Sequence, residues 1–349
     1  RAMPSVHVID LRRDGADSGL LSRPLRAAMA ERLERKEQVL LWLNRRGYSH
    51  HVQCRGCGWT PECRRCDITL TLHMDPREFR CHYCDHREPA MGQCPECKLP
   101  LLRLGSPGTQ RAEREIAQAF PLARLLRLDT DVAKDRGAPG KVLERFAKGE
   151  ADILLGTQMI AKGLDFPRVT LVGVLDADVA LHLPDFRAAE RTWQLLVQVS
   201  GRAGRGKRPG EVLVQTCTPE HVAIAAVASG DTKGFLTREL EERRDAGYPP
   251  FSRLVSLLVW GPDEAEVERA ARALGEIAVA AAEPHGVIVL GPAPQAHARL
   301  RNQHRWHLLL KGDNGGKVRE VAAAALAWAE QPGRRRAKVM ADVDPTDAL

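Results

Sequence analysis

Four Cys-x-x-Cys pairs lie within a window of 44 residues, and this feature constrains the chain more than any other. Each pair forms a tight turn that can point two thiolates at one metal ion, and eight thiolates make two tetrahedral sites. The alternatives are a disulfide cluster and a redox-active pair, but no export signal is visible and one redox pair would not need three more. The sequence therefore predicts two structural Zn²⁺ ions, whose ligands are Cys54, Cys57, Cys63, Cys66, Cys81, Cys84, Cys94 and Cys97.

Spacing limits how these pairs can combine around two ions. Joining the second pair to the third encloses residues 67–80, a loop of the length found in zinc ribbons. Joining the first pair to the second would enclose only residues 58–62, which is cramped. A ninth cysteine, Cys217, stands alone in an apolar run, and we expect it to be a buried strand thiol.

The composition is that of a globular protein with a mildly basic surface. Hydrophobic residues make up 44% of the 349 residues, and no apolar run is long enough to span a membrane. A formal net charge of +7 and a pI near 9.0 favour a polyanionic partner, but the excess charge is spread thinly along the chain. Aromatic residues are only 5%, which argues against wide stacking platforms for single-stranded nucleic acid. Cysteines in metal spacing without an export signal predict a cytoplasmic protein.

Strands alternate with helices through residues 1–246, which predicts a parallel α/β sheet. Ser22 is expected to cap a helix that ends near Lys36. The cysteine-rich stretch follows directly after a predicted strand, so we expect it to be an insertion in this domain. The predicted strands are 6–10, 38–44, 125–128, 152–156, 169–175 and 212–216, with further helices near 141–148, 186–198 and 232–245.

A second fold begins after Tyr248-Pro249-Pro250-Phe251, because consecutive prolines cannot continue a helix. The remaining elements follow the βαββαβ order of a ferredoxin-like domain: strand 254–260, helix 264–282, strands 287–290 and 306–311, helix 317–329 and strand 337–343. The predicted domains are 1–50 and 103–246, which form one α/β domain, the inserted module 51–102, and an α+β domain over 247–349.

Two glycine-containing loops are candidates for phosphate chemistry. The run Gly156–Gly163 follows a predicted strand, and the run Gln198–Gly206 follows a predicted helix. In the second run Arg202 and Arg205 lie three residues apart and could grip γ-phosphate oxygens as arginine fingers. Alone, this run could equally be a flexible basic turn, but its combination with the first run favours the functional interpretation.

Two other clusters have simpler explanations. Asp263-Glu264-Ala265-Glu266 resembles a metal-holding acidic box, yet acidic residues also favour the first turn of a helix, and we expect that role here. His297, His304 and His307 lie among arginines with no acidic residue between Ala296 and Lys311. This segment could be a phosphate-contacting hairpin or, equally, a solvated basic loop.

Taken together and in this order, the motifs resemble the PriA family of primosomal proteins over nearly the whole chain. The likeness rests on Asn44–Tyr48 before the cysteine-rich stretch, Gly105–Thr109 as helicase motif IV, Gly156–Gly163 with Asp165-Phe166-Pro167 as motif V, Gln198–Arg205 as motif VI, and Tyr248–Phe251, Gly291–Pro294 and Asp342–Pro345 in the C-terminal domain. Gln110 stands where family members often have Glu, a departure of little consequence.

The resemblance implies a superfamily 2, 3′-to-5′ DNA helicase that acts in replication restart. Such a protein binds branched DNA, including forks and D-loops, and works with primosome and single-strand-binding proteins. The implied fold is a RecA-like helicase lobe 2 with an inserted two-zinc module, followed by the α+β domain. The implied zinc sets are nested: Cys54, Cys57, Cys94 and Cys97 hold one ion, and Cys63, Cys66, Cys81 and Cys84 hold the other.

The resemblance also implies roles for the two loops. Arg202 and Arg205 would contact the γ-phosphate of ATP. Thr157, Gln158 and Lys162 would contact DNA or couple it to the nucleotide, and the remaining nucleotide contacts would come from Gly163, Asp165, Gln198 and Gly201.

The sequence contains no Walker A loop, and Gly137–Lys141 is only a near match with the wrong spacing. We therefore expect a fragment of a longer protein, in which ATP and Mg²⁺ bind only together with a first lobe, and no ATP hydrolysis by this chain alone. One alternative is a non-catalytic, zinc-dependent protein that binds DNA and primosome partners. A more remote one is a zinc-ribbon protein of another class, such as an RNA-modifying or transcription factor.

Overall fold

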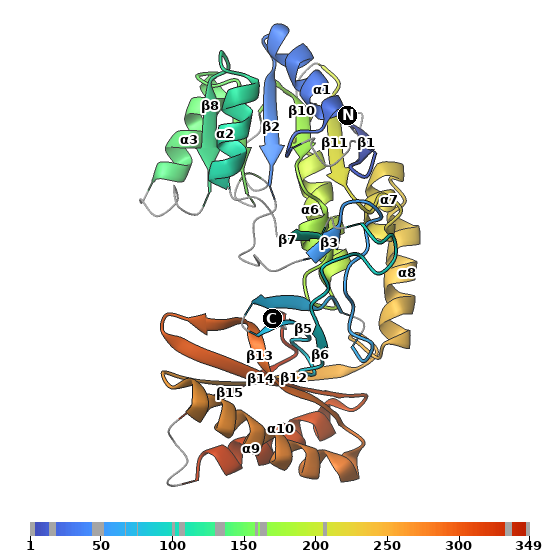
Figure 1. Cartoon of the computed structure of the whole chain (residues 1–349), viewed down its shortest axis with the longest axis vertical. Helices are drawn as coiled ribbons and strands as arrows, with labels where there is room; N and C mark the ends of the chain where they lie inside the picture. The colour runs from blue at the N-terminus through green and yellow to red at the C-terminus, as the bar shows by residue number, and fades with distance from the viewer. Residues whose placement is uncertain are drawn as a thin grey trace. The chain divides into compact units, whose positions relative to one another are not determined.

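The chain forms two compact units, seen in a computed structural model (Figure 1). Unit 1 comprises residues 1–59, 91–183 and 187–236, and unit 2 comprises 60–90, 184–186 and 237–349. The structure describes residues 4–13, 19–43, 52–66, 68–74, 76–99, 102–104, 109–129, 137–157, 160, 166–204, 208–331 and 337–346.

Unit 1 is built on a six-stranded, wholly parallel sheet, as the alternation of strands and helices predicts. Its strand order is β1-β11-β10-β2-β9-β8. Every residue of the central strands β2, β9 and β10 is buried, because helices cover both faces of the sheet. The strands are β1 Ser5–Asp10, β2 Gln38–Trp42, β8 Leu125–Leu128, β9 Ile153–Gly156, β10 Val169–Val174 and β11 Glu211–Thr216.

Two separate hydrophobic cores hold the helices of unit 1 to the sheet. Helices α1 (Arg23–Glu34) and α2 (Thr109–Ala119) contribute to one core, which includes Leu25 and Ile116. Helices α3 (Ala138–Lys148), α6 (Ala188–Ser200) and α7 (Val222–Ser229) contribute to the other. Ser22 caps α1 by accepting a hydrogen bond from Leu25 N at 3.3 Å, as predicted. The result is a three-layer αβα domain.

Smaller elements complete unit 1. Strands β3 (Val52–Cys54) and β7 (Leu102–Leu104) form an antiparallel pair at the two ends of the cysteine-rich stretch. The short helix α5 (Asp178–Leu181) follows β10. Helix α8 (Thr232–Asp245) begins in unit 1 and continues into unit 2.

Unit 2 contains the predicted ferredoxin-like domain. Its antiparallel sheet has the order β13-β14-β12-β15, and helices α9 and α10 pack on one face around a core that includes Leu257, Leu274 and Val321. The elements are β12 Arg253–Gly261, α9 Glu264–Ala282, η2 Glu283–His285, β13 Ile288–Leu300, β14 Gln303–Gly312, α10 Gly315–Ala329 and β15 Lys338–Val343. Asp263 caps α9 by accepting from Glu266 N at 2.8 Å, which confirms the helix-opening role of this acidic run.

Unit 2 also contains the middle of the cysteine-rich stretch. Strands β4 (Thr71–Met74), β5 (Arg77–Arg80) and β6 (Arg87–Pro89) form a three-stranded antiparallel sheet. The contacts therefore divide the cysteine-rich stretch, with residues 54–59 and 91–99 in unit 1 and residues 60–90 in unit 2. The three predicted domain boundaries, 50/51, 102/103 and 246/247, stay a prediction. Among the described residues, no helix is both long and apolar enough to cross a membrane.

Candidate metal centres and helicase motifs

The eight paired cysteines gather into two groups of four. Cys54, Cys57, Cys94 and Cys97 form what we call the outer set, in unit 1, and Cys63, Cys66, Cys81 and Cys84 form the inner set, in unit 2. Within each set all sulfurs lie within 4.8 Å of one another. Tetrahedral zinc with Zn–S bonds of 2.3 Å needs sulfurs about 3.8 Å apart, whereas a disulfide needs about 2.0 Å. Distances of 3.5 Å for Cys54–Cys97 and Cys57–Cys94 and of 3.7 Å for Cys63–Cys84 fit a metal site, and the nesting matches the sets that the resemblance implies.

A repeated backbone turn builds the cysteine pairs. In three of them the residue after the second cysteine has a positive φ: Gly58 (83°), Asp85 (59°) and Lys98 (61°). Its amide donates to the carbonyl oxygen of the first cysteine, at 2.8, 3.1 and 3.0 Å respectively. This turn points both thiols of a pair to the same side, toward the other pair of the set. The fourth pair has Asp67 at this place, outside the described residues.

Hydrogen bonding and burial set the thiol protonation of the outer set. Burial raises the pKa of Cys57 to about 12. Cys94 is also desolvated, but amide hydrogen bonds from Cys97 and Glu96, together with the neighbouring thiols, lower its pKa to about 7. The amide hydrogen bonds therefore favour ionisation at Cys94, and metal binding displaces the protons of the other thiols.

The outer set is packed against the helicase-like sheet of unit 1. A Cβ on Gly58 would lie 2.6 Å from the carbonyl oxygen of Cys217, so only glycine fits between the metal turn and the end of β11. The Gln53 amide donates to His182 Nε2 at 3.3 Å, and burial lowers the pKa of His182 to about 4, so this ring is neutral. Cys217 is fully buried one residue past β11, which confirms its predicted burial but places it beyond the strand.

Hydrogen bonds and ring contacts join the segments that carry the inner set to the ferredoxin-like domain. His82, between Cys81 and Cys84, donates from Nδ1 to Pro294 O at 2.7 Å, and His307 Nε2 donates to His82 O. Tyr248 donates its hydroxyl to Cys66 O at 3.3 Å. Tyr83 is fully buried and makes an edge contact with the Tyr248 ring, with centroids 6.5 Å apart. The cysteine turns and the sheet of unit 2 therefore share one packed interior.

His307 does not belong to a phosphate-binding surface, contrary to one of the two interpretations of its segment. It is 1% exposed, and burial lowers the pKa of His307 to about 4, so the ring is neutral and serves the structure. His304 is partly buried, with Nδ1 3.6 Å from a carboxylate oxygen of Glu264. The side chain of His297 lies outside the described residues.

The two helicase-like loops lie at opposite ends of the parallel strands. We call the end where the strands begin the amino edge of the sheet and the end where they finish the carboxyl edge. Thr157 follows β9 at the carboxyl edge, is 5% exposed, and donates its amide to Leu128 O at 3.3 Å. The segment after α6 instead returns to the amino edge, where Gly204 N donates to Val169 O at 3.2 Å. The intervening strand β10 has six residues, so the edges are about 17 Å apart at 3.3 Å per residue.

At the amino edge the structure brings the end of motif V and motif VI together. Phe166, next to Asp165, and Ala203, next to Arg202, are buried in the same core. Gly201 ends α6, Gln198 is exposed on that helix, and Arg202 is half-buried. The predicted site residues Gln158, Lys162, Gly163, Asp165 and Arg205 lie outside the described residues, so their roles stay predictions.

Gly204 has a role that the sequence pattern did not reveal. Its φ is +70°, and a Cβ there would lie 2.5 Å from Gly210 N, while a Cβ on Gly210 would lie 2.3 Å from Gly204 N. The two backbones are in direct contact and bring together the ends of the 204–210 segment, which carries Arg205. Gly204 is thus committed to backbone packing, whereas the sequence suggested that these glycines let the backbone approach a phosphate.

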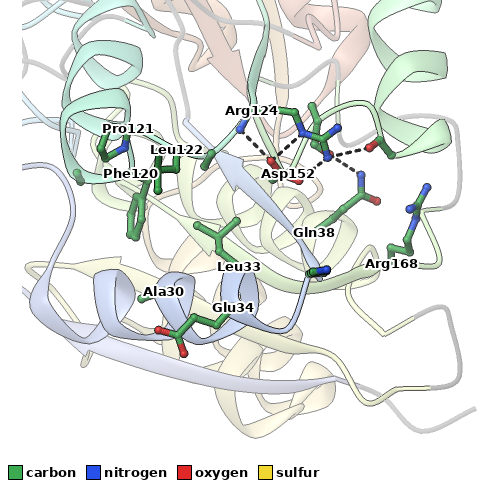
Figure 2. A pocket seen from close by; sticks show the side chains of 15 residues that line it. Ala30, Leu33, Glu34, Gln38, Phe120, Pro121, Leu122, Arg124, Asp152 and Arg168 are labelled. Carbon is green, nitrogen blue, oxygen red and sulfur yellow. Dashed lines mark hydrogen bonds and ion pairs between the residues drawn. The ribbon is translucent and has the colours of Figure 1, made fainter.

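A pocket of about 680 Å³ opens at the amino edge of the sheet, between the ends of α1 and α2 (Figure 2). Its wall includes Leu33, Phe120 and the 98%-exposed Leu122. Two lining arginines bind the end of α3: Arg124 donates to Gly149 O at 3.0 Å, and Arg168 donates to Ala147 O at 3.3 Å. These cations stabilise a helix C-terminus, so the described contacts assign them a structural role. The sequence patterns gave no sign of this pocket.

Three family models match the chain in succession. They are the helicase conserved C-terminal domain at residues 111–207, the PriA DNA helicase Cys-rich region domain at 63–89, and the primosomal protein N C-terminal domain at 244–346. Among solved structures, RecG bound to a three-way DNA junction matches over 69% of this chain and 22% of that chain, with 12% identity and a TM-score of 0.37, which is too low to support an argument.

Curated relatives extend the match along nearly the whole chain. The replication restart protein PriA of Bacillus subtilis is 44% identical over 89% of this chain and 39% of the relative. The PriA of Synechocystis is 42% identical over 89% and 38%, and that of Treponema pallidum is 38% identical over 100% and 52%. The chain thus spans about two fifths to one half of the length of these relatives. By its three successive domains and these relatives, the chain belongs to the PriA family, of which it represents the C-terminal half.

Proposed function

We propose that the chain is the second motor lobe, metal module and C-terminal domain of a PriA-like 3′-to-5′ DNA helicase that acts in replication restart. The observation that carries this proposal is that motif V begins at the carboxyl edge of one RecA-like sheet, at Thr157, whereas motif VI returns to the amino edge, at Gly204. A motor lobe must couple a nucleotide site to a nucleic-acid site, and a rigid sheet between the two can transmit movement from one to the other.

The amino edge would face the nucleotide. Arg202 lies there at the end of α6, and we assign to it and to Arg205 the supply of positive charge as the γ-phosphoryl group leaves. The further nucleotide contacts are assigned to Gly163, Asp165, Gln198 and Gly201. Packing of Phe166 and Ala203 in one core supports this role, because it fixes the two motifs relative to each other. ATP and Mg²⁺ would bind only when a first lobe supplies the phosphate loop and the metal-binding carboxylate.

The carboxyl edge would face DNA. Thr157, Gln158 and Lys162 lie at the end of β9 or follow it, and such a loop can offer hydroxyl, amide and ammonium groups to the phosphate backbone. We assign to the complete protein the binding of forks and D-loops, together with primosome and single-strand-binding proteins, in the cytoplasm. The alternative, a non-catalytic DNA- and partner-binding protein, is disfavoured by the complete motif VI sequence.

The metal in both cysteine sets should be zinc. Four thiolates at tetrahedral spacing match its preferred structural site, and no redox role is required. Elemental analysis of the purified chain should find two zinc ions, and Cys54→Ser should reduce the content to one while Cys217→Ser leaves it at two. One zinc in the wild-type chain, or iron, would contradict this assignment.

DNA binding by the 349-residue chain should be weak, steeply salt-dependent and selective for structure. The excess charge is small, so few phosphates are neutralised, and each contributes roughly −0.9 to the log–log salt slope on duplex. Fluorescence anisotropy with forked and linear DNA of several sequences, between 50 and 200 mM salt, measures both properties. A preference for one base sequence over forked DNA would reject the proposed function.

A further inference from the structure

The β13–β14 hairpin combines unusual charge with unusual turn geometry. No Asp or Glu occurs between Ile288 and Gly312, whereas the segment carries Arg299, Arg301, Arg305 and Lys311. The strands stay paired to the tip, where Arg299 lies opposite His304 and Leu300 lies opposite Gln303. The tip is therefore a formed structural element that carries two arginines, Arg299 and Arg301.

Arg301 is held in a backbone conformation that arginine does not favour. Arg301 and Asn302 have φ values of 52° and 59°, as in a two-residue hairpin turn with both central residues left-handed. Asparagine and glycine suit such positions, and Asn302 also accepts a hydrogen bond from Arg299 at 3.3 Å. Arginine at position 301 disfavours the turn, so its presence at an exposed tip indicates a use other than folding.

The tip arginines are exposed, and the one side-chain hydrogen bond described for them joins Arg299 to Asn302 within the tip itself. Neither Arg299 nor Arg301 forms an ion pair in the part of the chain that the structure describes. The nearby carboxylate of Glu264 faces His304 at 3.6 Å. Leu300, which lies between the two arginines in the sequence, has an apolar side chain that is 47% exposed.

We propose that this tip is a nucleic-acid contact, in which Arg299 and Arg301 bind phosphates on either side of a duplex junction and Leu300 packs against the base pair exposed there. Guanidinium groups suit phosphate oxygens, and exposed apolar side chains between cations are used as wedges at base steps. The inference rests on the proposed function in one respect, because it takes branched DNA as the ligand. Arg305 and Lys311 add to the field along the same hairpin.

The test combines Arg299→Ala with Arg301→Asn in the 349-residue chain. Because asparagine suits the turn, the thermal midpoint should stay the same or rise, while affinity for forked DNA falls roughly tenfold and the salt slope shrinks by about 1.8. The matched control, Lys233→Ala with Arg269→Ala, removes the same charge from exposed helix positions and should leave the affinity within about twofold. Leu300→Ser should lower the preference for forked over linear DNA without changing the slope.

The outcomes separate this inference from the proposed function. If the wild-type chain binds forked DNA and the double variant binds equally well with the same slope, the hairpin is not the contact and the proposed function stands. If the wild-type chain binds no DNA, both fail. If poly-glutamate, used as a competitor and as a direct ligand, binds with the same dependence on Arg299 and Arg301 and DNA does not, the surface recognises an acidic protein and the inference is overturned.

Discussion

Replacing one cysteine of the inner set should release one metal ion and unfold the ferredoxin-like domain with it. We expect Cys84→Ser to retain one zinc and to raise amide exchange across β12–β15 at least about a hundredfold. The reason is that the inner set and His82, which lies between two of its cysteines, bind that domain directly. Cys66 O accepts from the Tyr248 hydroxyl, His82 Nδ1 donates to Pro294 O, and His82 O accepts from His307 Nε2. Structural zinc contributes about 10–16 kcal/mol in zinc-finger peptides, more than most domains can lose.

Cys57→Ser is the matched control, because Cys57 and Cys84 are each the second cysteine of a pair and equally half-buried. It should also remove one zinc, but the increased exchange should appear around β3, β7 and the end of β11, where Gly58 contacts Cys217. Hydrogen exchange with mass spectrometry reads both regions in one experiment. Full protection of β12–β15 in Cys84→Ser would show that the domain folds without its metal.

Arg202→Ala and Arg205→Ala should each abolish ATP hydrolysis in a longer protein that contains the first lobe, while ATP and fork binding persist. An arginine finger acts on charge that develops in the transition state, and such contacts are worth about 10³–10⁵ in kcat in related hydrolases. Lysine should restore little activity, because an ammonium cannot reproduce the planar guanidinium fork. Single-turnover hydrolysis and nucleotide-binding titrations measure the two effects separately.

The natural controls for that experiment are the 349-residue chain and one further substitution. The chain alone should show no DNA-stimulated hydrolysis, since the sequence carries no Walker A loop. Arg208→Ala removes a nearby arginine that pairs with Glu37, and it should leave kcat within about threefold. Near wild-type hydrolysis by both motif VI variants would mean that the loop is only a basic turn.

The regular alternation of strand and helix patterns along the sequence made most of the fold predictable. The helix Glu264–Ala282 and the strand Leu125–Leu128 have the predicted bounds, because their hydrophobic periodicity is strong and capping or turn residues mark their ends. The α2 helix, Thr109–Ala119, was not predicted, although Ala112 and Ile116 face the core at helical spacing, because the preceding residues were interpreted only as a motif. The α7 helix, Val222–Ser229, is short and apolar throughout, so periodicity could not distinguish it from a strand.

Strand β13 was predicted to end at Leu290 but continues to Leu300. Pro292 and Pro294 argued against a strand, because each lacks an amide donor. The strand tolerates them since it lies at the edge of the sheet and its register shifts between Leu290 and Ala293. Edge position depends on the order of strands in space, which no local pattern carries.

For the cysteine sets, too, local sequence patterns predict short-range features but not tertiary contacts. Pair spacing and family resemblance predicted which thiols share an ion, because this depends on short loops. The assignment of the two sets to different units depends on contacts with Cys217, Tyr248 and His307, which lie more than a hundred residues away. Such partners are chosen by tertiary packing, and the sequence pattern around each cysteine pair does not contain them.

The path of the chain between the units limits how the protein can be divided. The backbone passes from one unit to the other at 59/60, 90/91, 183/184, 186/187 and 236/237. Domains joined by one linker can be expressed separately, exchanged between homologues or lost by truncation. Here a cut after residue 236 would leave residues 60–90 and 184–186 without the rest of their unit. Units 1 and 2 should therefore be inherited and expressed together, because truncation or exchange at that point would leave unit 2 incomplete.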